Sequence, residues 1–446
     1  MDSNSPLNHG NLNSCKLDGY SNCGYPLPYY EHALEATRTQ TKQQEGRSFL
    51  RDLNFEDLCY TAPLDNFLEL EPYTWYADLK SLQLEASASR AATTSQNFPS
   101  QDLGKAYISN AAKELGDLTS LKEAFHFLSN QEGFPQLIAI VGPTASGKTA
   151  LADLLAYLLD SSVLSFDSMQ IYKDMNIATA KAKSDELKAP LLGVDLIEAF
   201  ESYSVQQYQS YGRDIINKTI SQSKTLVLCG GTGLYLNSLV DNLNFVEGEQ
   251  VNNELRARYE AYLLKHGAQR LHELLASVDQ KSANCIHPQN TKRVIRALEM
   301  ADKGVSYAQQ LTGLHDHEML YDCAFIGCAW QREALYERIN KRVELMFDEG
   351  LLKEFEMLEN KGVFSSLTAS QAIGYKELLE HRDDLKKAQA LIAQRSRRYA
   401  KRQLSWFYRD NRVQWFNCQD TSLRSQLSSV FFYLYEISKA KLKSLD

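Results

Sequence analysis

The chain lacks the features that mark membrane, secreted and zinc-binding proteins. None of its apolar runs approaches the roughly 20 residues that a membrane-spanning helix requires. Its first residues, Met1 to Pro6, show neither the charged and apolar regions of a secretion signal nor the arginine-rich character of an organelle presequence. Its eight cysteines form no C-x-x-C pair and no metal-ligand spacing, which favours free thiols in a reducing compartment. We therefore expect a cytoplasmic protein without a membrane partner.

The chain also lacks an overall excess of positive charge, since its formal net charge is −8. The imbalance lies in residues 1–134, which carry 18 Asp and Glu residues against 10 Lys and Arg residues. Because the whole chain has 56 acidic and 48 basic residues, the remaining part has 38 of each and is neutral. The net charge therefore does not exclude a nucleic-acid partner for residues 135–446, where basic groups can be clustered.

The pattern of the sequence divides the chain into four parts. The first part contains no motif that carries chemistry, and we expect it to be an acidic extension that is partly disordered or helical. The predicted parts are this extension (1–134), the first part of a core (135–245), a helical insertion (246–315), and the last core strand with a basic helical C-terminal region (316–446).

Short β-rich runs separated by helical patterns predict the fold class of the core. This alternation is typical of an α/β protein with a parallel sheet. The strand pattern is interrupted from Asn253 to about Gly304, where charged amphipathic helices are expected. We therefore predict a P-loop NTPase-like parallel sheet flanked by helices, with an inserted helical subdomain and a helical C-terminal region. The four predicted strands are Leu137 to Val141, Val163 to Phe166, Thr225 to Cys229 and Cys323 to Trp330.

A complete G-x-x-x-x-G-K-[ST] motif follows the first of these strands. Its backbone N–H groups can surround a phosphate, Lys148 can add a positive charge, and the Thr149 hydroxyl can ligate Mg²⁺. By itself the motif predicts a polyphosphate ligand such as ATP or GTP. The predicted phosphate-binding residues are Gly142, Pro143, Thr144, Ala145, Ser146, Gly147, Lys148 and Thr149.

Polar residues also follow the other three predicted strands. Because ligands bind outside the carboxyl ends of parallel strands, these residues are expected to meet at one crevice. Asp167 follows the second strand, Thr232 the third, and Arg332 the fourth. Asp167 can act on Mg²⁺ or as a general base, although it could instead cap the next helix.

Six ordered motifs make this chain similar to a known family. From about Gln136 to Phe416 the sequence resembles the tRNA dimethylallyltransferases, also called tRNA isopentenyltransferases, in their bacterial form. The motifs are G-P-T-A-S-G-K-T (142–149), D-S-M-Q-I-Y (167–172), G-G-T-G-L-Y (230–235), I-H-P-Q-N-T-K-R-V-I-R-A-L-E (286–299), Q-A-I-G-Y-K-E (371–377) and R-Y-A-K-R-Q-L-S-W-F (398–407).

The resemblance implies that the loop binds the diphosphate of dimethylallyl diphosphate rather than a nucleoside triphosphate. The five-carbon group would pass to N6 of adenosine 37, next to the anticodon of a tRNA. In this reading Asp167 is the catalytic base. Lys148, Arg332 and a Mg²⁺ ion on Thr149 stabilise the charge on the leaving diphosphate.

The resemblance also implies a set of tRNA contacts with the anticodon stem-loop. The predicted contacts at the strand ends are Asp167, Ser168, Met169, Gln170 and Thr232, although some could be turn residues. The predicted contacts in the insertion are Arg256, Lys292, Arg293, Val294, Ile295 and Arg296. The basic segment 395–402 is a further candidate for RNA backbone contacts. We expect a monomer.

Two short segments depart from the family pattern and leave other functions open. Residues 178–182 read Ala-Thr-Ala-Lys-Ala where the family usually has G-T-A-K-P, and residues 191–195 read Leu-Leu-Gly-Val-Asp where it has H-H-L-I-D. The alternatives are prenylation of free AMP, ADP or ATP, a small-molecule kinase, and a catalytically inactive RNA-binding paralogue.

Overall fold

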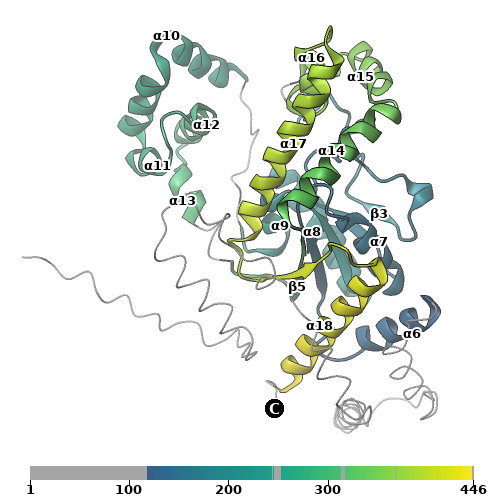
Figure 1. Ribbon diagram of the computed structural model, residues 1–446. Helices are drawn as coiled ribbons and strands as arrows, with labels where there is room; N and C mark the ends of the chain where they lie inside the picture. The colour runs from purple at the N-terminus through teal and green to yellow at the C-terminus, as the bar shows by residue number, and fades with distance from the viewer. Residues whose placement is uncertain (1–117, 244, 246–252, 313–316, 367, 444–446) are drawn as a thin grey trace, which may run out of the picture.

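The computed structural model describes residues 118–243, 245, 253–312, 317–366 and 368–443. The predicted features of residues 1–117 lie outside the described residues. In the described part of the chain, one sheet of six parallel strands forms the centre of the molecule (Figure 1). The strands are β1 (Leu137–Val141), β2 (Val163–Ser165), β3 (Leu191–Leu192), β4 (Leu226–Gly230), β5 (Cys323–Ala329) and β6 (Val413–Asn417).

The sheet has the order β3-β2-β4-β1-β5-β6, so β1 lies near its centre between β4 and β5. All five residues of β1 are buried, which explains why this strand is continuously apolar rather than alternating. Since every neighbouring pair is parallel, the carboxyl ends of all the strands meet at one edge. The predicted P-loop NTPase-like α/β class is confirmed.

Helices cover both faces of this sheet. Successive residues of a strand point to opposite faces. Leu137, Ala139 and Val141 pack into one core with α8, α9 and α14 to α17. Ile138 and Ile140 pack into a second core with α6, α7 and α18. The helices are α6 (Leu118–Ser129), α7 (Lys148–Leu158), α8 (Val205–Ser221), α9 (Gly233–Val240), α14 (Arg332–Asp348), α15 (Leu351–Asn360), α16 (Tyr375–Glu380), α17 (Leu385–Phe407) and α18 (Leu423–Lys443).

Two strands differ from the prediction. Within the C-terminal region that was predicted to be helical, α17 ends at Phe407 and the strand β6 begins six residues later. Residues 413–417 form a strand because β5 supplies a parallel partner and because Trp415 and Phe416 become buried there. The two-residue strand β3 was not predicted, since a strand so short leaves no periodic pattern.

The insertion is helical, as predicted, and it has a core of its own. It contains α10 (Asn253–Val278), α11 (Gln280–Cys285), α12 (Thr291–Ala301) and α13 (Tyr307–Thr312), which Figure 1 shows apart from the sheet. The helix α10 is kinked at Gly267, whose φ of 80° is easily adopted only without a side chain. Its core includes Tyr259, Leu271, Leu275 and Leu298.

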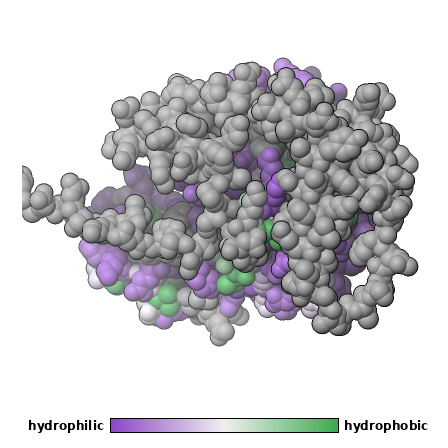
Figure 2. Space-filling view, turned by 90° about the horizontal axis from the view of Figure 1, so that it is seen from below, coloured by the Kyte–Doolittle hydropathy of each residue, from purple (hydrophilic) through white to green (hydrophobic). Residues whose placement is uncertain are grey.

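The described side chains that are visible on one face of the molecule are mostly polar (Figure 2). Seen from below, the described side chains in view are mainly hydrophilic, with a few separate hydrophobic ones between them (Figure 2). Among the residues that the structure describes, no helix is both long enough and apolar enough to cross a bilayer.

A buried ion-pair cluster holds together the two crossings between the core and the insertion. Asp241, at the end of α9, forms an antiparallel bridge with Met319, which precedes β5. Arg412 donates to the carboxylates of Asp241 and Asp410, the latter at 2.7 Å from Nη2 to Oδ2. Its guanidinium also lies 4.4 Å from the centre of the Phe325 ring. Asp241 is 1% exposed, so Arg412 neutralises a carboxylate that water does not reach.

We predict that Asp241→Ala lowers the free energy of unfolding by about 3–5 kcal/mol, because Arg412 would then remain buried without this partner. Urea denaturation followed by circular dichroism measures the change. Asp348→Ala on the exposed side of α14 serves as the control and is expected to be nearly neutral. Equal, small effects of both substitutions would contradict the assignment of the cluster as a stabilising element.

Candidate active site at the carboxyl edge of the sheet

The glycine-rich loop links the central strand β1 to the first turn of α7. Gly147 ends the loop with φ of 87°, and Lys148 is the first residue of the helix. Ala145 also has a positive φ, 65°, which is uncommon for a residue with a side chain. These conformations fold the loop back on itself, so that the Lys148 ammonium donates to the Pro143 carbonyl at 3.2 Å. The loop is therefore preorganised around the amino end of α7.

Two segments on the β5 side hold this loop. The Trp330 indole N–H donates to the Ser146 carbonyl at 2.9 Å. On α14, Arg338 Nε donates to the Ala145 carbonyl at 2.9 Å, and Arg342 Nη1 donates to Thr144 Oγ1 at 3.0 Å. Both arginines therefore contact the loop through backbone or hydroxyl oxygens.

Helix α17 joins the loop to the end of β4. The Gln403 side chain is 4% exposed; its Oε1 accepts from the Thr144 N–H at 2.8 Å, and its Nε2 donates to the Gly231 carbonyl at 3.0 Å. A Cβ on Gly231 would lie 2.0 Å from Gln403 Nε2, and a Cβ on Gly233 would lie 2.1 Å from the Trp406 ring. These two glycines of the 230–235 motif are therefore required by the close approach of α17.

Asp167 lies in a turn after β2 rather than at the start of a helix, so the alternative helix-cap role is not what the structure shows. Its Oδ1 accepts from the Met169 N–H at 3.0 Å. The Ser168 N–H donates to Thr232 Oγ1 at 3.1 Å, which ties this turn to the end of β4. Thr232 also lies close enough to Tyr399 of α17 to lower the pKa of that phenol, against the larger effect of burial. The predicted convergence of Asp167, Ser168 and Thr232 is therefore present.

The charges of the site influence one another. Burial lowers the pKa of Lys148, and the nearby Cys229 and Asp167 oppose this change. Burial also lowers the pKa of Arg342, while the charge of Asp167 opposes it. Burial raises the pKa of Tyr399, and Asp167 adds to the effect, so that its phenol keeps its proton. The side chains of Lys148, Arg342 and Asp167 are half-buried and lie close enough for their charges to act on one another, so that one site offers both anion-binding cations and a carboxylate.

Arg338 and Arg342 of α14 contact the glycine-rich loop, whereas the predicted Arg332 is exposed at the start of this helix. Arg332 is exposed at the first turn of this helix, whereas Arg342 lies almost three turns further along and contacts the loop. Helical periodicity contained this signal: Leu335, Ile339 and Val343 are buried, and Arg342 lies beside this inward face. The prediction rested only on proximity to the strand end.

The predicted tRNA contacts of the insertion differ in how accessible their side chains are to a ligand. Lys292 and Arg293 are exposed on α12. Arg256 Nε contacts the buried Glu299 carboxylate at 2.9 Å, and Arg296 Nη1 contacts it at 3.6 Å. The side chains of Val294 and Ile295 are buried in the core of the insertion, so they do not form a ligand-accessible surface.

The basic segment 395–402 is only partly free for RNA. Arg395 forms ion pairs with Glu377 and Glu380, both at 2.7 Å. Exposed cations remain at Arg398, Lys401 and Arg402. The motif 398–407 therefore serves largely to pack α17 against the crevice through Gln403 and Trp406.

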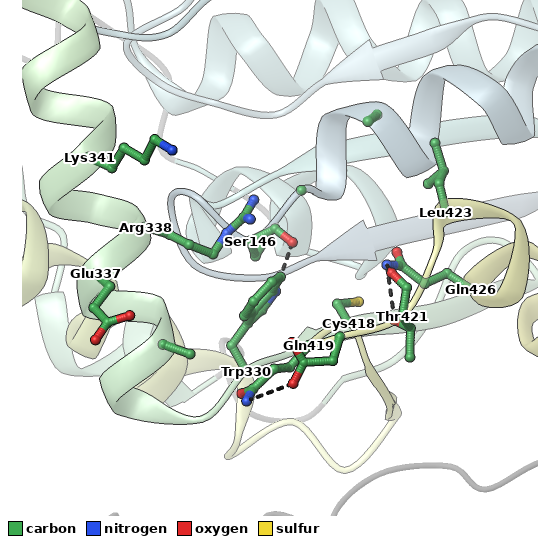
Figure 3. A pocket seen from close by; sticks show the side chains of 14 residues that line it. Ser146, Trp330, Glu337, Arg338, Lys341, Cys418, Gln419, Thr421, Leu423 and Gln426 are labelled. Atoms are coloured by element: carbon green, nitrogen blue, oxygen red, sulfur yellow. Dashed lines mark hydrogen bonds between the residues drawn. The ribbon is translucent and has the colours of Figure 1, made fainter.

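A cavity of about 650 Å³ lies on the other side of the loop from Asp167, beyond the ends of β5 and β6. Figure 3 shows Trp330, Arg338 and Lys341 along its walls, with the indole of Trp330 joined to Ser146. The loop therefore has the Asp167 crevice on one side and an open space on the other.

The oxygen donors of the site fit a magnesium ion that is held mainly by a phosphate ligand. Thr149 and Asp167 supply a hydroxyl and a carboxylate, which are hard ligands of the kind that Mg²⁺ prefers. The hydroxyl of Thr149 hydrogen bonds to the Cys229 thiol, whose pKa burial raises to about 12. Within the described ranges, no three His, Cys, Asp or Glu residues are grouped as a complete protein metal site.

This geometry defines a P-loop-type α/β protein with a carboxylate facing an anion-binding loop. The family model described as IPP transferase matches residues 170–410. A tRNA dimethylallyltransferase of Bacillus licheniformis is 42% identical over 306 residues, which cover 67% of this chain and 96% of that protein. A protein of the same name from Halalkalibacterium halodurans is 36% identical, with the same coverage of both chains. The chain belongs to the IPP transferase family.

Solved structures agree with this assignment. The full-length tRNA isopentenylpyrophosphate transferase of Bacillus halodurans has a TM-score of 0.50 at 35% identity, covering 70% of this chain and 99% of that one. A eukaryotic dimethylallyltransferase acting on tRNA shares the fold, with a TM-score of 0.55 at 24% identity over 64% of this chain and 74% of that one. Since the curated relatives match almost completely while a third of this chain lies outside the match, the chain carries an extension, as predicted.

We predict that Arg342→Gln lowers kcat/KM by about 10²–10³, because one preorganised donor to a developing anion is lost. Arg332→Ala is expected to change it less than about threefold, as is usual for exposed side chains. Steady-state kinetics with the substrate that the loop binds varied distinguishes the two. A large effect of Arg332→Ala with a small effect of Arg342→Gln would restore the original prediction.

Proposed function

We propose that the protein transfers a dimethylallyl group from dimethylallyl diphosphate to N6 of adenosine 37, next to a tRNA anticodon, and releases diphosphate. The observation that carries this proposal is the pairing, in a member of the IPP transferase family, of the anion-binding loop with the Asp167 carboxylate across one crevice. The relatives of known structure or sequence are named for acting on tRNA.

The residues of the crevice divide the reaction between them. The adenine N6 attacks C1 of the dimethylallyl group, the C1–O bond to diphosphate breaks, and Asp167 accepts the proton that N6 loses. Lys148, Arg342 and the loop N–H groups stabilise the departing diphosphate. An adenine that reaches this depth has to leave the anticodon stack, so we expect it to be flipped.

We propose Mg²⁺ as the cofactor, held by Thr149 and the diphosphate. When bound, it would neutralise negative charge on the leaving group. Thr149 presents its hydroxyl at the first turn of α7, and Lys148 adds a second positive charge to the same anion.

The helical insertion favours a polynucleotide acceptor over a free nucleotide. Lys292 and Arg293 are exposed on α12, in a helical unit that Figure 1 shows apart from the sheet, so only an extended ligand could meet both them and the loop. We propose that the anticodon stem-loop is this ligand, and that the protein acts as a monomer in the cytoplasm.

The substrate assignment is tested by incubating the full chain with dimethylallyl diphosphate, Mg²⁺ and either unmodified tRNA, AMP or ATP. Mass analysis of the nucleosides is expected to show prenylated adenosine from tRNA only. Product from AMP or ATP would indicate the free-nucleotide enzyme. Retained tRNA binding without any product would indicate the inactive paralogue.

We predict that Asp167→Asn lowers kcat by about 10²–10⁴, the range that a positioned base contributes. The dissociation constant of tRNA, measured by filter binding, is expected to stay within about threefold, since one contact among many is changed. Loss of tRNA binding in proportion to the loss of kcat would contradict the role of Asp167 as base.

A further inference from the structure

A buried carboxylate outside the crevice binds a whole turn of backbone. Glu354 on α15 is 8% exposed. Its Oε2 accepts from the N–H groups of Asn176 at 3.0 Å and Ile177 at 2.8 Å, and its Oε1 accepts from Ala178 at 3.3 Å. Three successive N–H groups directed at one point form an anion-binding concavity, here filled by the protein's own side chain.

Neighbouring aromatic side chains fix the position of this carboxylate. The hydroxyl of Tyr375 donates to Glu354 Oε1 at 2.6 Å. Burial raises the pKa of Tyr375, and the charge of Glu354 raises it further, so the phenol remains a donor. The Phe364 ring lies 5.1 Å from that of Phe355 and 5.5 Å from that of Tyr375, which restricts the phenol.

The turn held by Glu354 is connected to Asp167 by hydrogen bonds. Gln170 Nε2 donates to the carbonyls of Thr179 at 3.2 Å and Ala180 at 3.4 Å. Gln170 Oε1 accepts from Ser165 Oγ at 2.9 Å. Ser165 Oγ in turn accepts from the Asp167 N–H at 3.4 Å. These four hydrogen bonds therefore connect the end of β2 to residues 176–180.

The same turn shows how this chain accommodates an alanine at 178 and how the two departing segments contact each other. What residues 176–178 supply is backbone N–H, so an alanine at 178 serves as well as a glycine. Its methyl group lies where a Cβ on Gly374 would come within 2.8 Å, so the neighbouring segment keeps its glycine. Lys181, retained in the first segment, pairs with Asp195, retained in the second, at 2.5 Å.

We propose that Glu354 is a positioning residue for the transfer reaction, because it fixes the turn that holds Asp167 through Gln170 and Ser165. This inference rests on the proposed function of Asp167. Glu354 does not touch the crevice, so its effect should fall on kcat and not on KM. A displacement of about 1 Å in a reacting group can cost about 10² in rate.

Glu354→Gln is the first test, since an amide replaces one acceptor oxygen with a donor that faces backbone N–H groups. We expect kcat to fall about 10- to 100-fold, with KM for both substrates within about twofold. Glu356→Gln, an exposed change on the same helix, is the matched control and should have wild-type kinetics. Wild-type kcat in Glu354→Gln, or a loss confined to KM, would overturn the proposal.

A double-mutant cycle separates positioning from general damage to the fold. If Glu354 acts through Asp167, then Glu354→Gln should lower the residual rate of Asp167→Asn by less than about threefold, since coupled sites are not additive. The same 10- to 100-fold loss in both backgrounds would show a general structural role and reject the proposal.

Hydrogen exchange of the full-length variants tests the positioning without any activity. We expect faster exchange across residues 165–181 in Glu354→Gln than in Glu356→Gln, with the exchange of β1 unchanged. Unaltered exchange across this segment would overturn the inference even if tRNA prenylation is confirmed. A wild-type protein that fails to prenylate tRNA would refute the proposed function, while the exchange result would still decide whether Glu354 holds the turn.

Discussion

The arrangement of the crevice depends on one amide side chain. Gln403 binds an N–H of the glycine-rich loop with its oxygen and a carbonyl after β4 with its nitrogen, so it sets the spacing between two loops that the sheet alone would leave independent. Because Gln403 is buried, water does not compete for its hydrogen bonds. The two glycines beneath α17 leave room for the close approach of this helix. Without this contact, α17 would no longer hold the anion-binding loop and the Thr232 turn relative to each other. Ser168 and Tyr399 lie against the same turn.

The charged side chains of the site also depend on one another. Lys148 and Arg342 are both in surroundings that disfavour their charged forms, and Asp167 counters this on each of them. Binding a diphosphate would satisfy the cations, and it would place the reacting carbon between them and the carboxylate. One small set of charges can therefore serve both binding and chemistry.

Much of the core was predictable because its signals are local. Strand β1 is a continuous apolar run with a glycine-rich loop behind it, and the sequence motifs fix the loop, the Asp167 turn and the family. Arg342 was missed because its importance depends on helix phase and on which face of α14 meets the loop. Val294 and Ile295 were chosen from a motif, yet motifs mix residues that fold a helix with residues that face a ligand. Nothing in the sequence indicated the role of Glu354, since it binds backbone N–H groups that lie 176 to 178 positions earlier in the chain.

The contact between Thr144 and Gln403 also spans 259 residues of the chain. The strand that completes the sheet, β6, comes later still. On the ribosome, the glycine-rich loop is therefore made long before the helix that supports it. Long-range contacts of this kind close late and slowly. A nascent chain that stops before α17 would consequently carry the phosphate motif without an assembled site, so translation itself delays the appearance of the site until α17 and β6 have been made.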